Sequence, residues 1–281
     1  MPERRTPTPQ LLWQQVRYEN KLFWRTPVAA FFTLIFPLMF LVLFELLFGG
    51  QAVPGELSVA QFFAPSLAVF AAASATYTNL GIGVSIARDQ GILKRVRGTP
   101  LPPWIYLAGR IGSGIWIAFL GTVLMLGVGV LVYDLQVRVA TLPAATLAFL
   151  VGVATFAALG LTLAAFSPTG DSAPAIANVT LLPLAFISDV FIPLSEDAPR
   201  WLQLLGGLFP LKHFVHAFQH PFNPFVQQAG RIQWDHLAVM AAWGVVGVVL
   251  ALRFFSWEPR HGERVGRRRR RRRRAADEGA S

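Results

Sequence analysis

The stretch Ala144-Ala-Thr-Leu-Ala-Phe-Leu-Val-Gly-Val-Ala-Thr-Phe-Ala-Ala-Leu-Gly-Leu-Thr-Leu-Ala-Ala-Phe166 contains no charged residue. About 20 apolar residues in an α-helix match the roughly 30 Å thickness of the hydrocarbon core of a bilayer. Five more stretches are predominantly apolar and of comparable length, at residues 28–48, 60–87, 104–132, 174–192 and 236–256. The sequence therefore predicts an all-α polytopic membrane protein whose domain, residues 28–256, has six transmembrane helices.

Composition supports lipid as the solvent of this chain. Hydrophobic residues make up 54% of the 281 positions and charged residues only 14%, whereas a soluble domain carries about 25% charge. The chain contains no cysteine, which excludes disulfides, thiolate chemistry and cysteine-based metal sites.

The net charge of +10 depends on one segment. Eight of the 25 basic residues form the run Arg267–Arg274, and without it the net charge is +2. We interpret residues 257–281 as a disordered cytoplasmic tail beside a membrane helix, where anionic headgroups are nearer partners than nucleic acid.

The distribution of Lys and Arg predicts the orientation. Twenty-one of these residues fall on the side of the N-terminus and four on the other side. Because cytoplasmic loops carry the excess of positive charge, both termini are expected in the cytoplasm.

Two segments outside the spans have helical patterns of their own. Within the cytoplasmic N-terminus, residues 1–27, a basic stripe predicts either an interfacial helix over 11–25 or a simple juxtamembrane extension. The stripe consists of Gln14, Arg17, Lys21 and Arg25. Prolines cut residues 193–232 into pieces too short to span, which predicts an outer re-entrant hairpin that packs against other helices as a lid. Its apolar face consists of Trp201, Leu204, Leu205 and Leu208.

A basic segment separates the second and third expected spans. It reads Arg88-Asp-Gln-Gly-Ile-Leu-Lys-Arg-Val-Arg97, followed by Thr99-Pro-Leu-Pro102. Gly91 permits a tight turn, and the prolines stop the helix and stiffen the return into the membrane. Such a cationic helix, within residues 88–103, suits docking to a complementary cytoplasmic protein, although a positive-inside anchor without a partner has the same composition.

This segment resembles the cytoplasmic signature of the ABC-2 type transporter permease family, which runs acidic residue, x, Gly, x, Leu, two basic residues, x, basic residue, x, Thr-Pro-Leu. A second resemblance, to the fifth span and outer hairpin of that family, runs from Leu182-Pro183-Leu184 through Ser188 and Pro193 to Pro199-Arg200-Trp201-Leu202 and Pro210-Leu211. Together the two cover about residues 11–256. Asp189 departs from the pattern, because many members have Gly there.

The resemblance implies a permease subunit of an ATP-driven exporter in a bacterial cell membrane. Two such subunits, identical or paralogous, would each bind a separate ATPase that holds ATP and Mg²⁺. The residues expected to couple to that ATPase are Arg88, Asp89, Gly91, Leu93, Lys94, Arg95 and Arg97. Resemblance to the drug-resistance, daunorubicin-type branch implies an amphipathic drug or lipid-like substrate, and a polysaccharide or glycolipid is the alternative.

The chain itself is expected to be neither an enzyme nor a cofactor protein. It has no GxxxxGK[ST] pattern, so it lacks the loop that cradles phosphates in many ATPases. An ion-coupled secondary transporter would need carboxylates near the middle of the membrane, and Glu45 and Asp189 lie near expected span ends. A membrane scaffold without transport is a further alternative.

Polar residues inside two spans are candidates for a translocation path. They are Ser74, Tyr77 and Thr78 in the second span and Asn178 and Thr180 in the fifth. Such groups can equally bind helices to one another, at about 0.6 kcal/mol per contact. His213, His216 and His220 have a spacing that could bind zinc, but no neighbouring carboxylate is apparent in the sequence, and we expect no metal.

Overall fold

The structure is a computed structural model that describes residues 7–50, 57–194, 198–226 and 230–258. The arginine run and most of the predicted tail lie outside these residues. The N-terminal half contains α1 (Thr8–Trp24), α2 (Pro27–Ala30), η1 (Phe31–Ile35), α3 (Phe36–Phe48), α4 (Val59–Ala73), η2 (Ser74–Asn79), α5 (Leu80–Asp89), α6 (Ile92–Arg97) and α7 (Pro103–Tyr133). The C-terminal half contains η3 (Val139–Thr141), α8 (Leu142–Phe166), α9 (Ala173–Ile187), α10 (Arg200–Leu208), α11 (Pro210–Gln219), η4 (His220–Phe222) and α12 (Trp234–Phe254).

Among the described residues, five helical segments are long and apolar enough to cross a membrane: Pro27–Phe48, Val59–Asp89, Pro103–Tyr133, Val139–Phe166 and Trp234–Phe254. The polytopic all-α fold is therefore confirmed.

The expected fifth span at 174–192 corresponds to α9, a helix of only 15 residues, or about 22 Å. This is shorter than the hydrocarbon core, so the count of six is not confirmed. The helix ends because Asp189 adopts a left-handed conformation with φ of 59°, and the chain continues through buried, non-helical residues 188–191.

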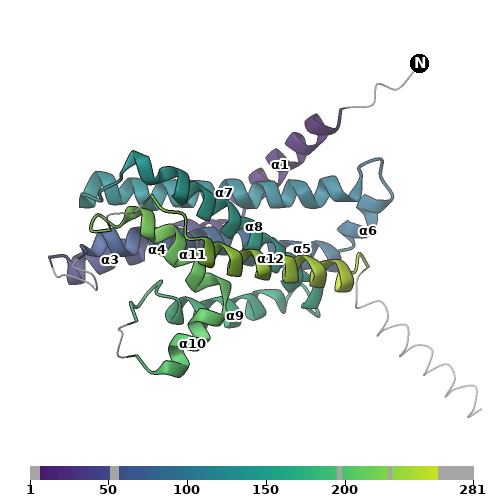
Figure 1. The fold of residues 1–281 in the computed structure, drawn as a ribbon. Coiled ribbons are helices and arrows are strands. Elements are labelled where there is room, and N and C mark those ends of the chain that lie inside the picture. Colours follow the sequence, from purple (N-terminus) through teal and green to yellow (C-terminus); the bar gives the residue numbers. More distant parts are fainter. Residues whose placement is uncertain (1–6, 51–56, 195–197, 227–229, 259–281) are drawn as a thin grey trace, which may run out of the picture.

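The long helices lie side by side (Figure 1). We call the end that carries α6 the basic end, and the opposite end, with α10, the hairpin end. The second span, Val59–Asp89, is buried throughout its apolar window and packs against α7 and α8, while α12 covers α8. The second span is thus the central element of the bundle.

A wide π-helical turn interrupts each of the first two spans. In the first span, η1 immediately precedes α3, whose second residue is the buried Pro37. Pro37 lies inside the continuous helical segment Pro27–Phe48 and has no backbone N–H to donate to the preceding turn, so the π-helical turn lies where the regular hydrogen-bond ladder is interrupted. In the second span, η2 coincides with the predicted polar cluster.

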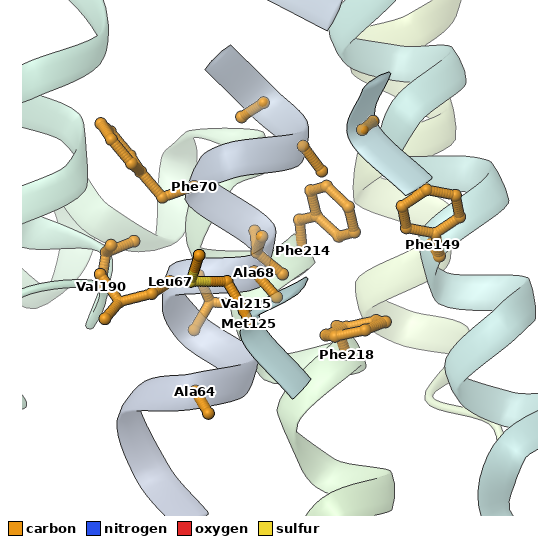
Figure 2. Packing of buried hydrophobic residues seen from close by; sticks show 14 of the residues in the cluster. Ala64, Leu67, Ala68, Phe70, Met125, Phe149, Val190, Phe214, Val215 and Phe218 are labelled. Carbon is orange, nitrogen blue, oxygen red and sulfur yellow. The ribbon is translucent and has the colours of Figure 1, made fainter. Parts of the chain in front are cut away.

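The predicted hairpin is only partly a packed element. As expected, proline-started short helices replace a span, and α11 inserts Phe214, Val215 and Phe218 into the main apolar core, close to Leu67 and Ala68 (Figure 2). The apolar face of α10 does not pack as expected, because Trp201, Leu204, Leu205 and Leu208 are all exposed. In the part of the chain that the structure describes, α10 packs mainly on its neighbours α9 and α11, which leaves this face outward.

The N-terminal helix α1 lies along the first turns of α7. Its predicted polar stripe is exposed, but Glu19 is buried and forms an ion pair with Arg110 at 3.2 Å. Burial raises the pKa of Glu19, and the charge and hydrogen bond of Arg110 only partly oppose that rise. The helix is therefore fixed to the bundle on one side and basic on the other.

Candidate functional site

The basic segment folds as two helices joined by a turn at Gly91. Gly91 has φ of 69°, a left-handed conformation that glycine adopts without steric cost. Leu93 of α6 is fully buried in a cluster with residues of α5, α7 and α8. Lys94, Arg95 and Arg97 are exposed, so the turn anchors α6 by its apolar residue and presents its cations outward.

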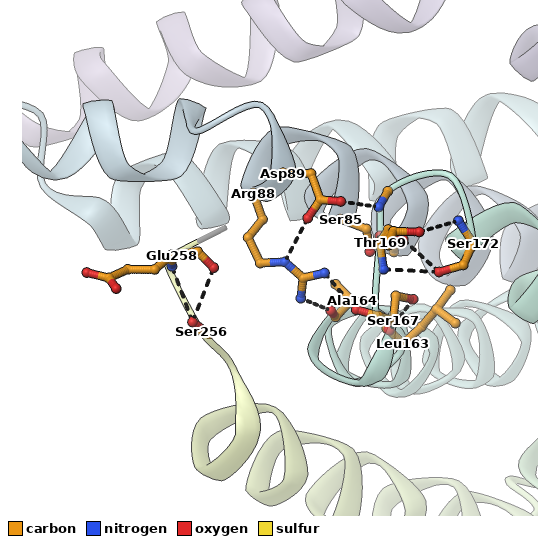
Figure 3. Close-up of polar contacts among 12 residues, drawn as sticks. Ser85, Arg88, Asp89, Leu163, Ala164, Ser167, Thr169, Ser172, Ser256 and Glu258 are labelled. Carbon is orange, nitrogen blue, oxygen red and sulfur yellow. Dashed lines mark hydrogen bonds and ion pairs between the residues drawn. The ribbon is translucent and has the colours of Figure 1, made fainter. Parts of the chain in front are cut away.

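Arg88 points in the opposite direction, into the protein (Figure 3). Its side chain is 1% exposed and donates hydrogen bonds to the carbonyl oxygens of Ala164, at 2.7 Å, and Ser167, at 2.6 Å. These carbonyls lie at the end of α8, where helical C=O groups have no partner within the helix and the helix dipole is negative. Arg88 is thus a buried C-terminal cap for another helix.

Asp89 extends this contact to the turn between α8 and α9. One carboxylate oxygen pairs with Arg88 Nε at 3.4 Å, and the other accepts a hydrogen bond from the backbone N–H of Gly170 at 2.5 Å. Within the turn, the backbone N–H of Thr169 donates to Ser172 Oγ at 3.1 Å and that of Ser172 donates to Thr169 Oγ1 at 3.0 Å. We call Arg88, Asp89, Ser167 and Gly170 the basic-end latch.

The structure thus divides the seven residues expected to couple to an ATPase. Lys94, Arg95 and Arg97 have the exposure that docking needs, whereas Arg88 and Leu93 are buried and Asp89 is mostly buried. Sequence reasoning missed Ser167 and Gly170, because the segment 167–173 has no basic residue. The Pro-Thr-Gly sequence at 168–170 was the available turn signal.

Two of the five polar residues proposed for the path contact each other. Tyr77, in the π-helical turn, has its hydroxyl 2.7 Å from Thr180 Oγ1 on α9. Ser74 is buried, and the buried hydroxyl of Thr78 has no hydrogen-bond partner among the described residues. Asn178 lies on α9 and is exposed. The described chain therefore brings the second span and α9 together at Tyr77, and α9 presents part of its polar surface outward.

At the hairpin end, Asp189 receives three contacts. Its carboxylate accepts from His216 Nε2 at 2.8 Å and from the backbone N–H of Leu194 at 2.8 Å, and it pairs with Lys212 Nζ at 3.4 Å. Burial by itself would raise the pKa of Asp189, but these hydrogen bonds and charges outweigh it and lower the pKa. Its backbone is left-handed, with φ of 59°, a conformation that glycine adopts without steric cost.

The three histidines of the hairpin have different partners. His213 Nδ1 lies 2.7 Å from His236 Nδ1 on α12, and His216 contacts Asp189. His220 and His236 line a cavity of about 330 Å³ near Asp189. Among the described residues, no group of three His, Cys, Asp or Glu side chains is arranged to hold a metal ion.

Comparison with known proteins identifies the family. The family model described as ABC-2 type transporter matches residues 10–222, which is most of the chain. The chain belongs to the ABC-2 type transporter family.

Curated relatives of this ABC-2 chain include three permeases. Inner membrane transport permease YadH of Escherichia coli is 25% identical over 196 residues, covering 68% of this chain and 75% of the relative. Putative transport permease YvfS of Bacillus subtilis is 26% identical over 242 residues, covering 86% and 95%. The daunorubicin resistance ABC transporter permease protein DrrB1 of Streptomyces coeruleorubidus is 29% identical over 198 residues, covering 68% and 67%.

Family membership settles the class of function. This ABC-2 chain is a multi-pass membrane protein and a permease subunit of an ABC transporter. The family match runs from residue 10, within α1, to the end of η4, so it includes both the basic-end latch and Asp189.

Proposed function

We propose that this permease exports an amphipathic drug or lipid-like substrate across a bacterial cell membrane, driven by ATPase subunits that dock on α6. The observation that carries the docking assignment is the pattern of α6, a short helix with one buried anchor, Leu93, and three exposed cations. Complementary charge would orient the ATPase on these cations. ATP and Mg²⁺ would be held by the ATPase.

The orientation that this requires is compatible with the arrangement of the helices. The described end of α12 lies at the basic end together with α6, and α1 packs along the first turns of α7 (Figure 1). Placing the basic end in the cytoplasm puts most of the described Lys and Arg residues there, as the positive-inside rule requires.

The path is proposed to run between the second span and α9, where two permease subunits meet. The exposed residues Asn178, Val179 and Thr180 of α9 would face the second subunit, which is identical or paralogous. ATP-driven closure of the two ATPases would push α6 in each subunit and separate the bundles along this surface. The hairpin would cover the exit.

The choice of an amphipathic cargo has two supports. One is the printed function of DrrB1 in daunorubicin resistance. The other is that the acidic residues in the described spans, Glu45, Asp89 and Asp235, all lie near helix ends, which disfavours an ion-coupled mechanism. A polysaccharide or glycolipid is the alternative cargo.

Affinity purification of the tagged chain from its native membrane tests the partner. We expect a stoichiometric subunit with a GxxxxGK[ST] loop. Changing Lys94, Arg95 and Arg97 together to Glu should weaken its association at least about tenfold, since each contact becomes repulsive. Unchanged association would refute docking on α6.

Matched variants show whether a loss of association comes from the docking site itself, from the change in net charge or from a change in membrane topology. Arg138, Arg200 and Arg231, all exposed toward the hairpin end, changed together to Glu should leave association within about twofold, because they lie outside the proposed contact. A cysteine at Ser256, single in this cysteine-free chain, reports whether the basic end remains inside. ATP-dependent movement of ethidium or of a fluorescent phospholipid in proteoliposomes then tests the cargo.

A further inference from the structure

Consecutive residues at the end of α5 hold the end of α8 and the beginning of α9. Arg88 occupies the terminal carbonyls of α8 with a planar guanidinium that keeps its charge at all relevant pH values. It is 1% exposed, so water does not compete for these bonds, and hydrogen bonds in such a medium are stronger than in water. The connection between α5 and α8 is therefore stiff, and it does not depend on a change of protonation.

Asp89 reaches beyond α8. Its bond to Gly170 fixes the turn from which α9 starts, and Thr169 and Ser172 brace that turn through reciprocal hydrogen bonds. Gly170 lies so close to α5 that a Cβ atom there would be 3.0 Å from the Cα of Ile86. The turn therefore rests directly on the backbone of α5.

The distance along the chain from this contact to α6 is short. Only Gln90 and Gly91 separate α5 from α6, and Leu93 packs in the cluster that also contains Val84 and Ala87 of α5. A displacement of α6 therefore reaches the end of α5 with little slack.

We propose that Arg88 and Asp89 are positioning residues that convey displacement of α6 to the basic end of α9. This inference rests on the proposed function, because it needs an ATPase that moves α6. A residue that only capped α8 would stabilise the subunit without changing how α9 responds to nucleotide, and that difference makes the two roles separable.

The experiment uses the complex with its ATPase, reconstituted in nanodiscs. Val179 is 74% exposed on α9, and Val179→Cys in this cysteine-free chain carries a single spin label. Val245 on α12, 64% exposed, supplies the matched reference position. The change in label mobility between the nucleotide-free state and the state trapped with MgATP and vanadate is normalised to the amount of trapped nucleotide.

With the latch intact, we expect a nucleotide-dependent change at position 179 that exceeds the change at 245. Arg88→Gln should reduce the change at 179 at least about fivefold, and Arg88→Lys should restore part of it, because Lys keeps the charge but reaches fewer acceptors. Arg110→Gln, which removes another ion-paired arginine near the basic end, with a side chain that is 10% exposed, should keep the full response.

The outcomes separate the two proposals. A full response in Arg88→Gln overturns the role of the latch and leaves the proposed function standing, whereas loss of all nucleotide response with the latch intact overturns the proposed function. If Arg88→Gln does not fold, Asp89→Asn decides, because it removes the charge that holds Gly170 at a partly exposed position. A response equal to that of the unsubstituted latch would then reject the inference.

Discussion

The helix α9 is held at both ends, but by different chemistry. At the basic end, the buried Arg88 and Asp89 hold the turn before α9 through carbonyl and amide groups of the backbone. At the hairpin end, Asp189 follows α9 and is held by Lys212 and His216. The His216 side chain is 38% exposed, whereas Arg88 is 1% exposed.

We call these two attachments of α9 the basic-end joint and the hairpin-end joint. The difference in exposure indicates which of them can open. The guanidinium of Arg88 is almost fully buried and keeps its charge in a protein, whereas water can compete for the contact of the partly exposed His216 with Asp189. The basic-end joint is therefore suited to carrying force, and the hairpin-end joint to yielding. Transport would then begin at a rigid end of α9 and finish at a releasable one.

The largest expected effect is at Arg88. Arg88→Met should lower the free energy of unfolding by about 3–5 kcal/mol, because it leaves buried polar partners unpaired. Reversible unfolding in mixed micelles, followed by tryptophan fluorescence, measures this. Arg97→Met removes the same charge at an exposed site and should cost less than about 0.5 kcal/mol. Equal losses would remove the distinction between buried and exposed cations of this segment.

A smaller loss is expected at the hairpin end. Asp189→Asn keeps a residue that tolerates φ of 59° but loses the charge on two contacts, and should cost about 1.5–3 kcal/mol. Asp134 has a similar φ of 54° and is exposed, so Asp134→Asn should cost less than about 0.5 kcal/mol. If the loss at Asp189 matched that at Arg88, the hairpin-end joint would not be the weaker one.

Acidification should weaken the hairpin-end joint. The pKa of Asp189 is lowered in the folded protein, so its stabilisation is complete above the unfolded carboxyl pKa of about 3.9 and is lost as the pH falls through the lower, folded value. The difference in unfolding free energy between the unsubstituted chain and Asp189→Asn should therefore shrink below about pH 4. A constant difference down to pH 2 would mean that the carboxylate charge does not contribute.

Replacement of a glycine by alanine should change the free energy of unfolding in opposite directions at the two ends of the molecule. Gly91→Ala should cost about 1–2 kcal/mol from backbone strain alone, since its φ is 69° and no atom lies near its missing side chain. Gly207→Ala on α10, where the space is also open, should stabilise by about 0.5–1 kcal/mol through helix propensity. Thermal unfolding of both variants in the same detergent measures this, and destabilisation at both positions would contradict it.

The smallest effect is expected midway along α9. Tyr77→Phe removes the hydroxyl that contacts Thr180 and should cost about 0.6 kcal/mol, the average for such bonds between membrane helices. Thr180→Val should give a similar loss, and the double variant little more than either single one. A fully additive double variant would show that the two hydroxyls act independently.

The spacing of apolar, basic and proline residues along the sequence predicted most of the fold. The apolar stretches, the basic stripe of α1 and the proline breaks before α10 and α11 are local features, and local physics determines them. The length of α9 was overestimated because the apolar residues Val190, Phe191 and Ile192 extend the hydrophobic stretch beyond Ile187. Only the left-handed backbone of Asp189 shows that the helix has already stopped.

The candidate site was less predictable, because the positive charge of a side chain does not show whether it points into the protein or outward. Arg88 and Lys94 belong to one basic run, yet one caps a helix from the inside and the other faces out. The partners of Arg88 are the backbone carbonyls of Ala164 and Ser167, more than 70 residues away. Because every residue type has a backbone carbonyl, the sequence does not mark these partners. Asp189 was noted as a departure from the family pattern, but its contacts with His216 and Lys212 required the fold.

The π-helical turn Ser74–Asn79 sets the angular phase of the second span. Such a turn closes its ladder one residue later than an α-helix, and one residue corresponds to about 100° around the axis. Rewinding this turn to α-helical form would therefore swing the following half-span, with Arg88, off the end of α8. While Arg88 donates its hydrogen bonds to those two carbonyls, the second span cannot rotate about its axis at this end. Loss of these hydrogen bonds would allow the second span to rotate.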